Sequence, residues 1–134
     1  MNYKLYKGFD QRVCLEIAKN ADNRQVVKDV SYAGFLHAHN PNSIYCERID
    51  EKAFLLGQVQ KGAFRIIGIG THVDWRRKGL ASLLLKRCEE YARENQLKKV
   101  KTRSLSGASF YAKRGYDIIG MRGGDYLLEK QLDY

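Results

Sequence analysis

The spacing of hydrophobic residues changes at Pro41, the only proline in the chain. Before it, apolar residues recur mostly at helical intervals, whereas after it short apolar runs alternate with polar turns. The first part predicts a short strand near residues 3–6, a helix over residues 10–20 and a second helix over residues 24–38. The part that follows begins with strands.

Three strands joined by tight turns are predicted after the proline. They cover residues 43–49, 53–60 and 63–73, and turns of three and two residues separate them. Such short turns join antiparallel neighbours, because a parallel crossover needs a dozen residues or more. The sequence therefore predicts an antiparallel meander over residues 43–73.

Helical spacing returns after residue 79 and predicts an amphipathic helix. Its apolar face is expected to hold Leu80, Leu83, Leu84, Cys88 and Tyr91. The charged residues around the rest of the helix are Lys86, Arg87, Glu89, Glu90 and Arg93.

A strand over residues 99–103, a short helix over 108–114 and two closing strands near 116–119 and 126–128 complete the chain. Gly115 is expected to end the short helix, because glycine readily takes the left-handed conformation there. The element order predicts an α+β fold: a mixed, mostly antiparallel, twisted sheet of about six to seven strands flanked by helices.

Length and composition limit the number of domains and the compartment. The 134 residues suit a single domain over residues 1–134. No run approaches the roughly 20 apolar residues of a membrane span, and the N-terminus has no apolar signal-peptide segment. The three cysteines are odd in number and lack a C-x-x-C pair, which favours reduced thiols. We therefore expect a cytoplasmic protein without membrane association.

The chain is basic, with 24 Lys and Arg against 15 Asp and Glu and a formal net charge of +9. This excess favours an anionic partner, which could be a phosphate-rich cofactor, a nucleic acid or an acidic protein. A basic surface without a dedicated partner is an equally open interpretation.

The segment THVDWRRKGLA, residues 71–81, carries the most chemical information. An apolar strand ends here, Arg76, Arg77 and Lys78 follow, and Gly79 opens the amphipathic helix. The first turn of a helix has unpaired N–H groups and partial positive charge, so it binds anions. The basic residues and Ser82 add donors, which predicts a diphosphate site; a solvated basic loop is the alternative.

The segment does not follow the patterns of the common nucleotide-binding folds. It lacks G-x-x-x-x-G-K-S/T, and Gly68 and Gly70 are not followed by the third glycine of G-x-G-x-x-G. These absences argue against mononucleotide and dinucleotide folds.

The same segment resembles motif A of the GNAT superfamily of N-acetyltransferases, written R/Q-x-x-G-x-G/A. Arg76, Gly79 and Ala81 match its three fixed positions. A second segment, GASFYAKRGY at residues 107–116, is similar to the superfamily's motif B, A-x-x-F-Y-x-K-x-G-F. Its matching residues are Phe110, Tyr111, Lys113 and Gly115, with Tyr116 in place of phenylalanine.

Two residues depart from motif B. Gly107 stands where alanine is usual, and Ser104 stands where an asparagine often precedes the helix. The two motifs nevertheless occur in the expected order and at the expected separation. The chain is therefore similar to the superfamily over residues 43–120, and less so over its first forty residues.

This resemblance implies an acyl-CoA N-acyltransferase fold in which successive segments of the chain have different roles. Residues 1–40 would form the acceptor-side helices, 43–73 the meander, 76–94 the cofactor pyrophosphate loop and helix, and 99–134 the C-terminal half. Acetyl-CoA would be the co-substrate, with no metal ion. The residues expected to contact it are Ile69, Thr71, Val73, Arg76, Arg77, Lys78, Gly79, Leu80, Ala81, Ser82 and Tyr111.

The resemblance also implies direct transfer of an acetyl group to a primary amine within a ternary complex. Gly68 and Gly70 would mark a bulge that separates two parallel strands, so that backbone groups of one strand bind the cofactor. An alternative is that these glycines simply relieve packing.

Transfer needs an acid for the leaving thiolate and a base for the amine. Tyr111 occupies the position where superfamily members often place the acid. Glu47 is the predicted base, with His72, Asp74 and Glu51 as weaker candidates. An acetyl-cysteine intermediate on Cys46 or Cys88 is a minor alternative.

The acceptor is open on sequence grounds: a small-molecule amine, a peptide or an aminoacyl-RNA would each suit the chemistry. His37 and His39 lack a third ligand at metal spacing. Two other functions remain open, a basic nucleic-acid-binding module and a CoA-binding scaffold without turnover. Superfamily relatives often form dimers, so a homodimer is a further expectation.

Overall fold

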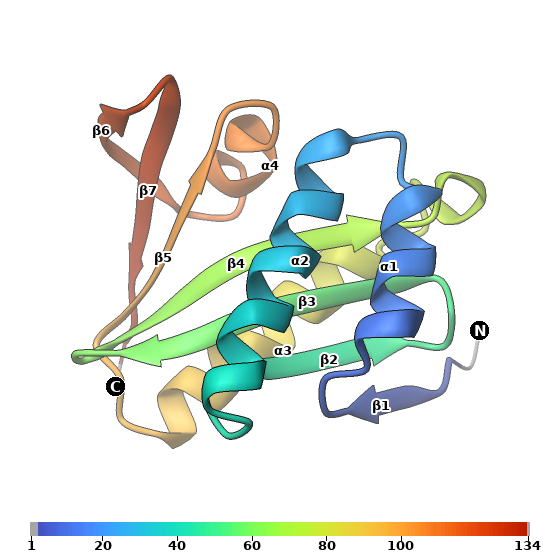
Figure 1. The fold of residues 1–134 in the computed structure, drawn as a ribbon. Helices are drawn as coiled ribbons and strands as arrows, with labels where there is room; N and C mark the ends of the chain where they lie inside the picture. The colour runs from blue at the N-terminus through green and yellow to red at the C-terminus, as the bar shows by residue number, and fades with distance from the viewer. Residues whose placement is uncertain (1–2, 134) are drawn as a thin grey trace.

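The computed structural model describes residues 3–133, and its seven strands form one sheet in the order β1-β2-β3-β4-β5-β7-β6 (Figure 1). The strands are β1 (Leu5–Lys7), β2 (Tyr45–Ile49), β3 (Ala53–Gln60), β4 (Ala63–Thr71), β5 (Lys99–Ser104), β6 (Asp117–Arg122) and β7 (Asp125–Gln131). The helices are α1 (Gln11–Lys19), α2 (Arg24–His39), α3 (Leu80–Glu94) and α4 (Ala108–Ala112). The predicted fold class, a mixed and mostly antiparallel sheet with flanking helices, is confirmed.

The sheet divides between β4 and β5, which are its only parallel neighbours among the described strands. They pair over three residues, from Ala63 opposite Lys99 to Arg65 opposite Lys101, and then diverge (Figure 1). A shift in the pairing of β3 with β4 leaves Ile67 as an extra residue in β4. Such a bulge bends its strand, so the predicted separation of two parallel strands is present just beyond Arg65.

Helices cover both faces of the sheet (Figure 1). The side chains of β3 alternate: Phe54 and Leu56 are buried beneath α1 and α2, whereas Leu55 is buried beneath α3. This alternation gives two core clusters, one on each face, because successive strand residues point to opposite sides.

Side-chain caps fix the start of the two N-terminal helices. Asp10 accepts a 3.3 Å hydrogen bond from the N–H of Val13, and Asn23 accepts one of 2.9 Å from the N–H of Gln25. Helix α3 differs, because it begins after Gly79 and no side chain caps its N-terminus.

Two details of the predicted pattern are wrong. Strand β4 ends at Thr71, and Val73–Trp75 forms a short 3-10 helix, so the third meander strand is two residues shorter than predicted. On α3, Leu83 is 37% exposed, whereas Glu89 is only 5% exposed. Glu89 therefore belongs to the packed face of the helix, where only apolar residues were expected.

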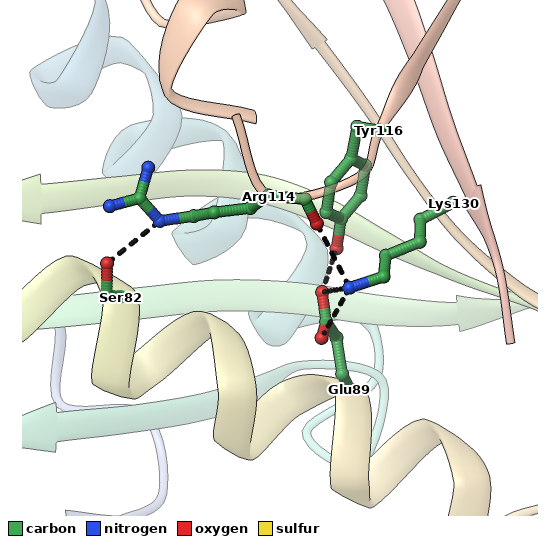
Figure 2. Close-up of polar contacts among 5 residues, drawn as sticks. All are labelled: Ser82, Glu89, Arg114, Tyr116 and Lys130. Carbon is green, nitrogen blue, oxygen red and sulfur yellow. Dashed lines mark hydrogen bonds and ion pairs between the residues drawn. The ribbon is translucent and has the colours of Figure 1, made fainter. Parts of the chain in front are cut away.

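A polar cluster around Glu89 holds the segment after α4 against α3 (Figure 2). The Tyr116 hydroxyl donates a 2.8 Å hydrogen bond to Glu89, and the Lys130 ammonium lies 3.2 Å from the same carboxylate. Lys130 also donates to the backbone carbonyl of Arg114 at 3.0 Å. The buried carboxylate thus has partners from two further segments, as a buried charge requires.

The cysteines are buried free thiols in the structure. Burial raises the pKa of the Cys88 thiol above its usual range, which disfavours the nucleophilic thiolate. Within residues 3–133, no helix has both the length and the apolar character that crossing a membrane requires.

Candidate active site

The divergence of β4 and β5 opens a cavity of about 850 Å³ through the sheet. Its walls come from α2, β4, β5 and α4, and include Asp29, Gly68, Thr102 and Tyr111. Beyond the last paired residues the β5-facing edge of β4 has no strand partner, although the Thr102 hydroxyl still lies 3.3 Å from the Ile66 carbonyl. Exposed strand backbone in a cavity is suited to binding an extended ligand by strand addition.

A second cavity of about 440 Å³ adjoins the first and lies at the start of α3. The two share lining residues such as Ile69, Thr71 and Phe110, so they form one continuous cleft. The smaller cavity is lined by Arg76, Arg77 and Arg114 and by no acidic residue of the described chain. An anionic ligand group is therefore favoured in this part of the cleft.

Gly79 opens the N-terminus of α3 toward that cavity. Its φ of +79° is in the left-handed region that favours glycine, and a Cβ built there would meet no heavy atom within 4 Å. The first intrahelical bond runs from the N–H of Leu83 to the carbonyl of Gly79, at 3.0 Å. The amides of the three intervening residues precede that bond and have no side-chain cap, so they are suited to binding an anion.

The arginines around this site are held in different ways. Arg76 donates to the carbonyl of Ala21 at the end of the α1 segment. Arg114 donates a 2.8 Å hydrogen bond to the Ser82 hydroxyl (Figure 2). It also donates to the Phe110 carbonyl at 2.8 Å, and its guanidinium lies 3.9 Å from the centre of the Phe110 ring. Arg77 is exposed beside the cavity. Arg114 is thus preorganised, and Ser82 keeps its own proton for donation.

The structure brings most of the predicted cofactor residues to this cleft. Those that line it are Ile69, Thr71, Arg76, Arg77, Gly79, Leu80, Ala81, Ser82 and Tyr111. Lys78 and Val73 line neither cavity, and the N–H of Val73 donates to the Asn20 carbonyl at 2.8 Å. Val73 is therefore part of the contact between β4 and the end of α1, and its amide is not free to bind a ligand.

Tyr111 lies on α4 with its side chain in the wall of the larger cavity. It is 5% exposed and packs edge-on against Phe110 and Tyr116, with ring centroids 5.2 and 5.4 Å apart. Burial raises the pKa of the Tyr111 phenol above its usual value, and a hydrogen bond with Thr102 opposes that rise only in part. The phenol is consequently protonated at neutral pH and can act as a proton donor.

Glu47 does not line either cavity. It is 1% exposed on the α3 face of β2, where Arg87 of α3 forms an ion pair with it and the Tyr45 hydroxyl lies 3.5 Å away. The buried carboxylate of Glu47 is paired with the half-buried guanidinium of Arg87, so it joins β2 to α3 and is poorly placed to receive a proton from a substrate. Its role as base stays a prediction that this geometry does not favour.

The weaker base candidates occupy a different place. Glu51, His72 and Asp74 line a third cavity beside α1. The His72 imidazole caps the short 3-10 helix by accepting from the N–H of Asp74 at 3.1 Å. The structure therefore separates these three residues from the cleft between β4 and β5.

Sequence reasoning missed three residues of the cleft: Asp29, Thr102 and Arg114. Asp29 and Thr102 belong to no motif, and only the separation of the strands brings them together. Arg114 lies inside the second motif at a variable position, so its approach to Ser82 depended on how α4 packs on α3.

The family model described as "Acetyltransferase (GNAT) domain" matches residues 22–118, which is most of the chain. The chain belongs to the GNAT acetyltransferase family. The resemblance of the two motifs to this family is thereby confirmed. No curated protein sequence matches the chain significantly.

Solved structures resemble this GNAT domain over its whole length. A PaiA N-acetyltransferase from Thermoplasma acidophilum, in complex with coenzyme A, superposes with a TM-score of 0.79 at 14% identity and covers 98% of this chain and 99% of its own. Ard1 from Thermoplasma volcanium gives 0.76 at 16% identity and full coverage of both chains. The ribosomal-protein-S18-alanine N-acetyltransferase from Escherichia coli gives 0.76 at 10% identity, covering 99% and 96%. At these identities the likeness shows the fold of this GNAT domain.

Proposed function

We propose that this GNAT domain moves an acetyl group from acetyl-CoA to a primary amine, directly and within a ternary complex. One observation carries the proposal: the uncapped N-terminus of α3, with its three arginines, opens into the same cleft as the buried phenol of Tyr111. A diphosphate at the helix and a thioester beside the phenol would occupy the two adjoining parts of that cleft.

The diphosphate fits the residues around Gly79. The free amides of Leu80, Ala81 and Ser82 would bind its oxygens, and Arg77 and Arg114 would neutralise its charge. Because a Cβ at Gly79 would point into open space, its absence lets a phosphate approach the backbone.

The unpaired edge of β4 would hold the extended arm between diphosphate and thioester. Ile69 and Thr71 line both parts of the cleft, so their backbone groups are placed to pair with an amide-containing chain. An N–H on this edge would also stabilise negative charge that develops on the thioester oxygen.

Tyr111 would donate its proton to the departing thiolate. A leaving thiol with a pKa of about 8.5 departs more easily when a positioned acid protonates its sulfur. A tyrosine phenol is protonated at neutral pH, as this role needs, and burial raises the pKa of Tyr111 further above its usual value. The acceptor would enter from the side of α1 and α2, in residues 1–40.

The experiment is a thiol-release assay with acetyl-CoA, run with and without a panel of primary amines: amino acids, polyamines, short peptides and an aminoacyl-RNA. The proposal expects amine-dependent thiol release and an acetylated product by mass spectrometry. Tight, steeply salt-dependent nucleic-acid binding without acetyl-CoA binding would instead favour a nucleic-acid module. Acetyl-CoA binding without turnover on any amine would favour a scaffold.

A further inference from the structure

Asp29, in the middle of α2, reaches the cleft from the face of the sheet opposite α3. Its carboxylate lies directly over Gly68 of β4: a Cβ built on Gly68 would be 2.5 Å from Oδ2. Gly68 follows Ile67, the extra residue of the bulge at which β4 leaves β5. The missing side chain of Gly68 therefore lets a carboxylate approach the exposed part of β4.

One oxygen of this carboxylate is left for a ligand. Oδ1 accepts a 2.9 Å hydrogen bond from the Gln25 amide. Within residues 3–133, no hydrogen bond or ion pair engages Oδ2, whereas the buried carboxylates of Glu47 and Glu89 are each paired with a cation. Asp29 is half-buried, so leaving one of its oxygens unpaired raises the free energy of the folded protein. A cationic ligand bound to that oxygen would offset this penalty.

Asp29 is the acidic residue that α2 contributes to the lining of the cleft, and both basic and acidic groups surround it. The positive charge of Arg65 on β4 favours the ionised form of Asp29, whereas the negative charge of Asp125 on β7 disfavours it. Asp125 is itself paired with Arg103 at 2.8 Å. The ionisable residues that face Asp29 or flank it are Arg65 of β4, Asp125 of β7, Tyr111 of α4, and Lys28 and Tyr32 of α2. Burial is the largest influence and raises the pKa of Asp29 to about 6.

Asp29 and Tyr111 line the same cavity from opposite faces of the sheet. Tyr111 belongs to the core cluster on the α3 face, whereas Gly68 faces Asp29 of α2, and both Tyr111 and Asp29 line the same cavity. If the acetyl donor extends from the α3 N-terminus to Tyr111, the acceptor has to enter on the α2 side. There it meets the free oxygen of Asp29.

We propose that Asp29 binds the ammonium group of the acceptor and takes a proton from it, which makes the acceptor a cationic primary amine. This assignment rests on the proposed acetyl transfer. The amine nitrogen forms a bond to the acetyl carbon as the carbon–sulfur bond breaks, and the sulfur leaves with the electron pair. The nitrogen gives up two protons: one passes to Asp29 and then to solvent, and the other replaces the proton that Tyr111 gives to the thiolate.

The test compares wild type with Asp29→Asn, using acetyl-CoA and the best alkylamine from the panel. The variant should lose about 100-fold in turnover and should need more amine for half-saturation, because it lacks both the base and the negative charge. Its affinity for acetyl-CoA should not change. The wild-type rate should rise with pH through an inflection near 6, as Asp29 loses its proton, and this inflection should be absent in the variant.

Two controls separate this role from a general effect of charge or folding. Asp22→Asn removes an exposed carboxylate that does not line the cleft, and it should behave as wild type. Hydroxylamine, a nucleophile that is already neutral at the assay pH, should restore much of the enzyme-dependent rate in Asp29→Asn, measured after its direct reaction with the thioester is subtracted. A variant as active as wild type with the alkylamine, in an otherwise active enzyme, would overturn the assignment of Asp29. A wild type that releases no thiol with any amine would instead overturn the proposed function.

Discussion

Tyr116 donates a 2.8 Å hydrogen bond to the buried carboxylate of Glu89 (Figure 2). Tyr116 directly follows Gly115, whose φ of +91° turns the chain after α4. The contact therefore fixes the end of α4 on α3, and with it the helix that carries Tyr111. Residues outside the cleft thus position Tyr111, the proposed proton donor.

Replacing Glu89 should destabilise the protein strongly. Glu89→Ala leaves the Tyr116 hydroxyl and the Lys130 ammonium without their shared partner, which we expect to cost about 3 kcal/mol in the free energy of unfolding. Chemical denaturation measures the change. Glu90→Ala, at the exposed neighbouring position, should stay within about 0.5 kcal/mol of wild type. Equal effects of the two substitutions would contradict the role of the Glu89 cluster.

A side chain at Gly79 should weaken acetyl-CoA binding. Gly79→Ala and Gly62→Ala both place alanine at a positive φ, +79° and +69°, with no heavy atom within 4 Å of the new methyl group. Each substitution should therefore lower the free energy of unfolding by a similar amount, about 1 kcal/mol. Calorimetry should find weaker acetyl-CoA binding only in Gly79→Ala, since only that methyl group lies at the N-terminus of α3. Equal acetyl-CoA affinities in the two variants would remove Gly79 from the binding site.

Loss of the Tyr111 hydroxyl should slow transfer without affecting binding. Tyr111→Phe keeps the buried ring but removes the acid, so kcat should fall about 100-fold while the Kd for acetyl-CoA is unchanged. Tyr91→Phe is the matched control, because Tyr91 packs against Tyr45 and Phe64 and lines neither cavity of the cleft. An unchanged kcat in Tyr111→Phe would show that the phenol is not the acid.

The position of Asp29 should lower stability at neutral pH. Its pKa rises from the usual 3.8 to about 6 in the folded protein, so between these values the folded chain holds more protons than the unfolded chain. The free energy of unfolding therefore falls as pH rises through this window. Asp29→Asn should gain on the order of 1 kcal/mol at pH 7.5, and this gain should vanish near pH 4. Thermal unfolding of both proteins across pH would measure it; a gain independent of pH would contradict a half-buried carboxylate with a raised pKa.

Hydrophobic spacing was sufficient to predict most of the fold. The meander and the start of α3 follow from local pattern and turn chemistry, and they lie where they were expected. Local pattern could not place Glu89, because a charged residue on a helix is normally solvated and its partners, Tyr116 and Lys130, lie far along the chain.

The candidate site was predictable where its residues form a continuous segment. Residues around Gly79 could be assigned because a helix N-terminus is a local feature. Asp29 could not be assigned, since its approach to Gly68 depends on how α2 packs across the sheet. Glu47 had the right residue type on a plausible strand, but no local pattern indicated that Arg87, forty residues later, would pair with it.

The most direct test of the account is a titration with acetyl-CoA followed at the backbone amides by NMR spectroscopy. We expect saturable binding, with the largest shifts at the amides of Leu80, Ala81 and Ser82 and further shifts along β4 at Ile69 and Thr71. The Gly79→Ala variant should require more ligand for the same shifts. Absence of saturable binding, or shifts confined to residues outside the cleft, would contradict the assignment of this site to acetyl-CoA.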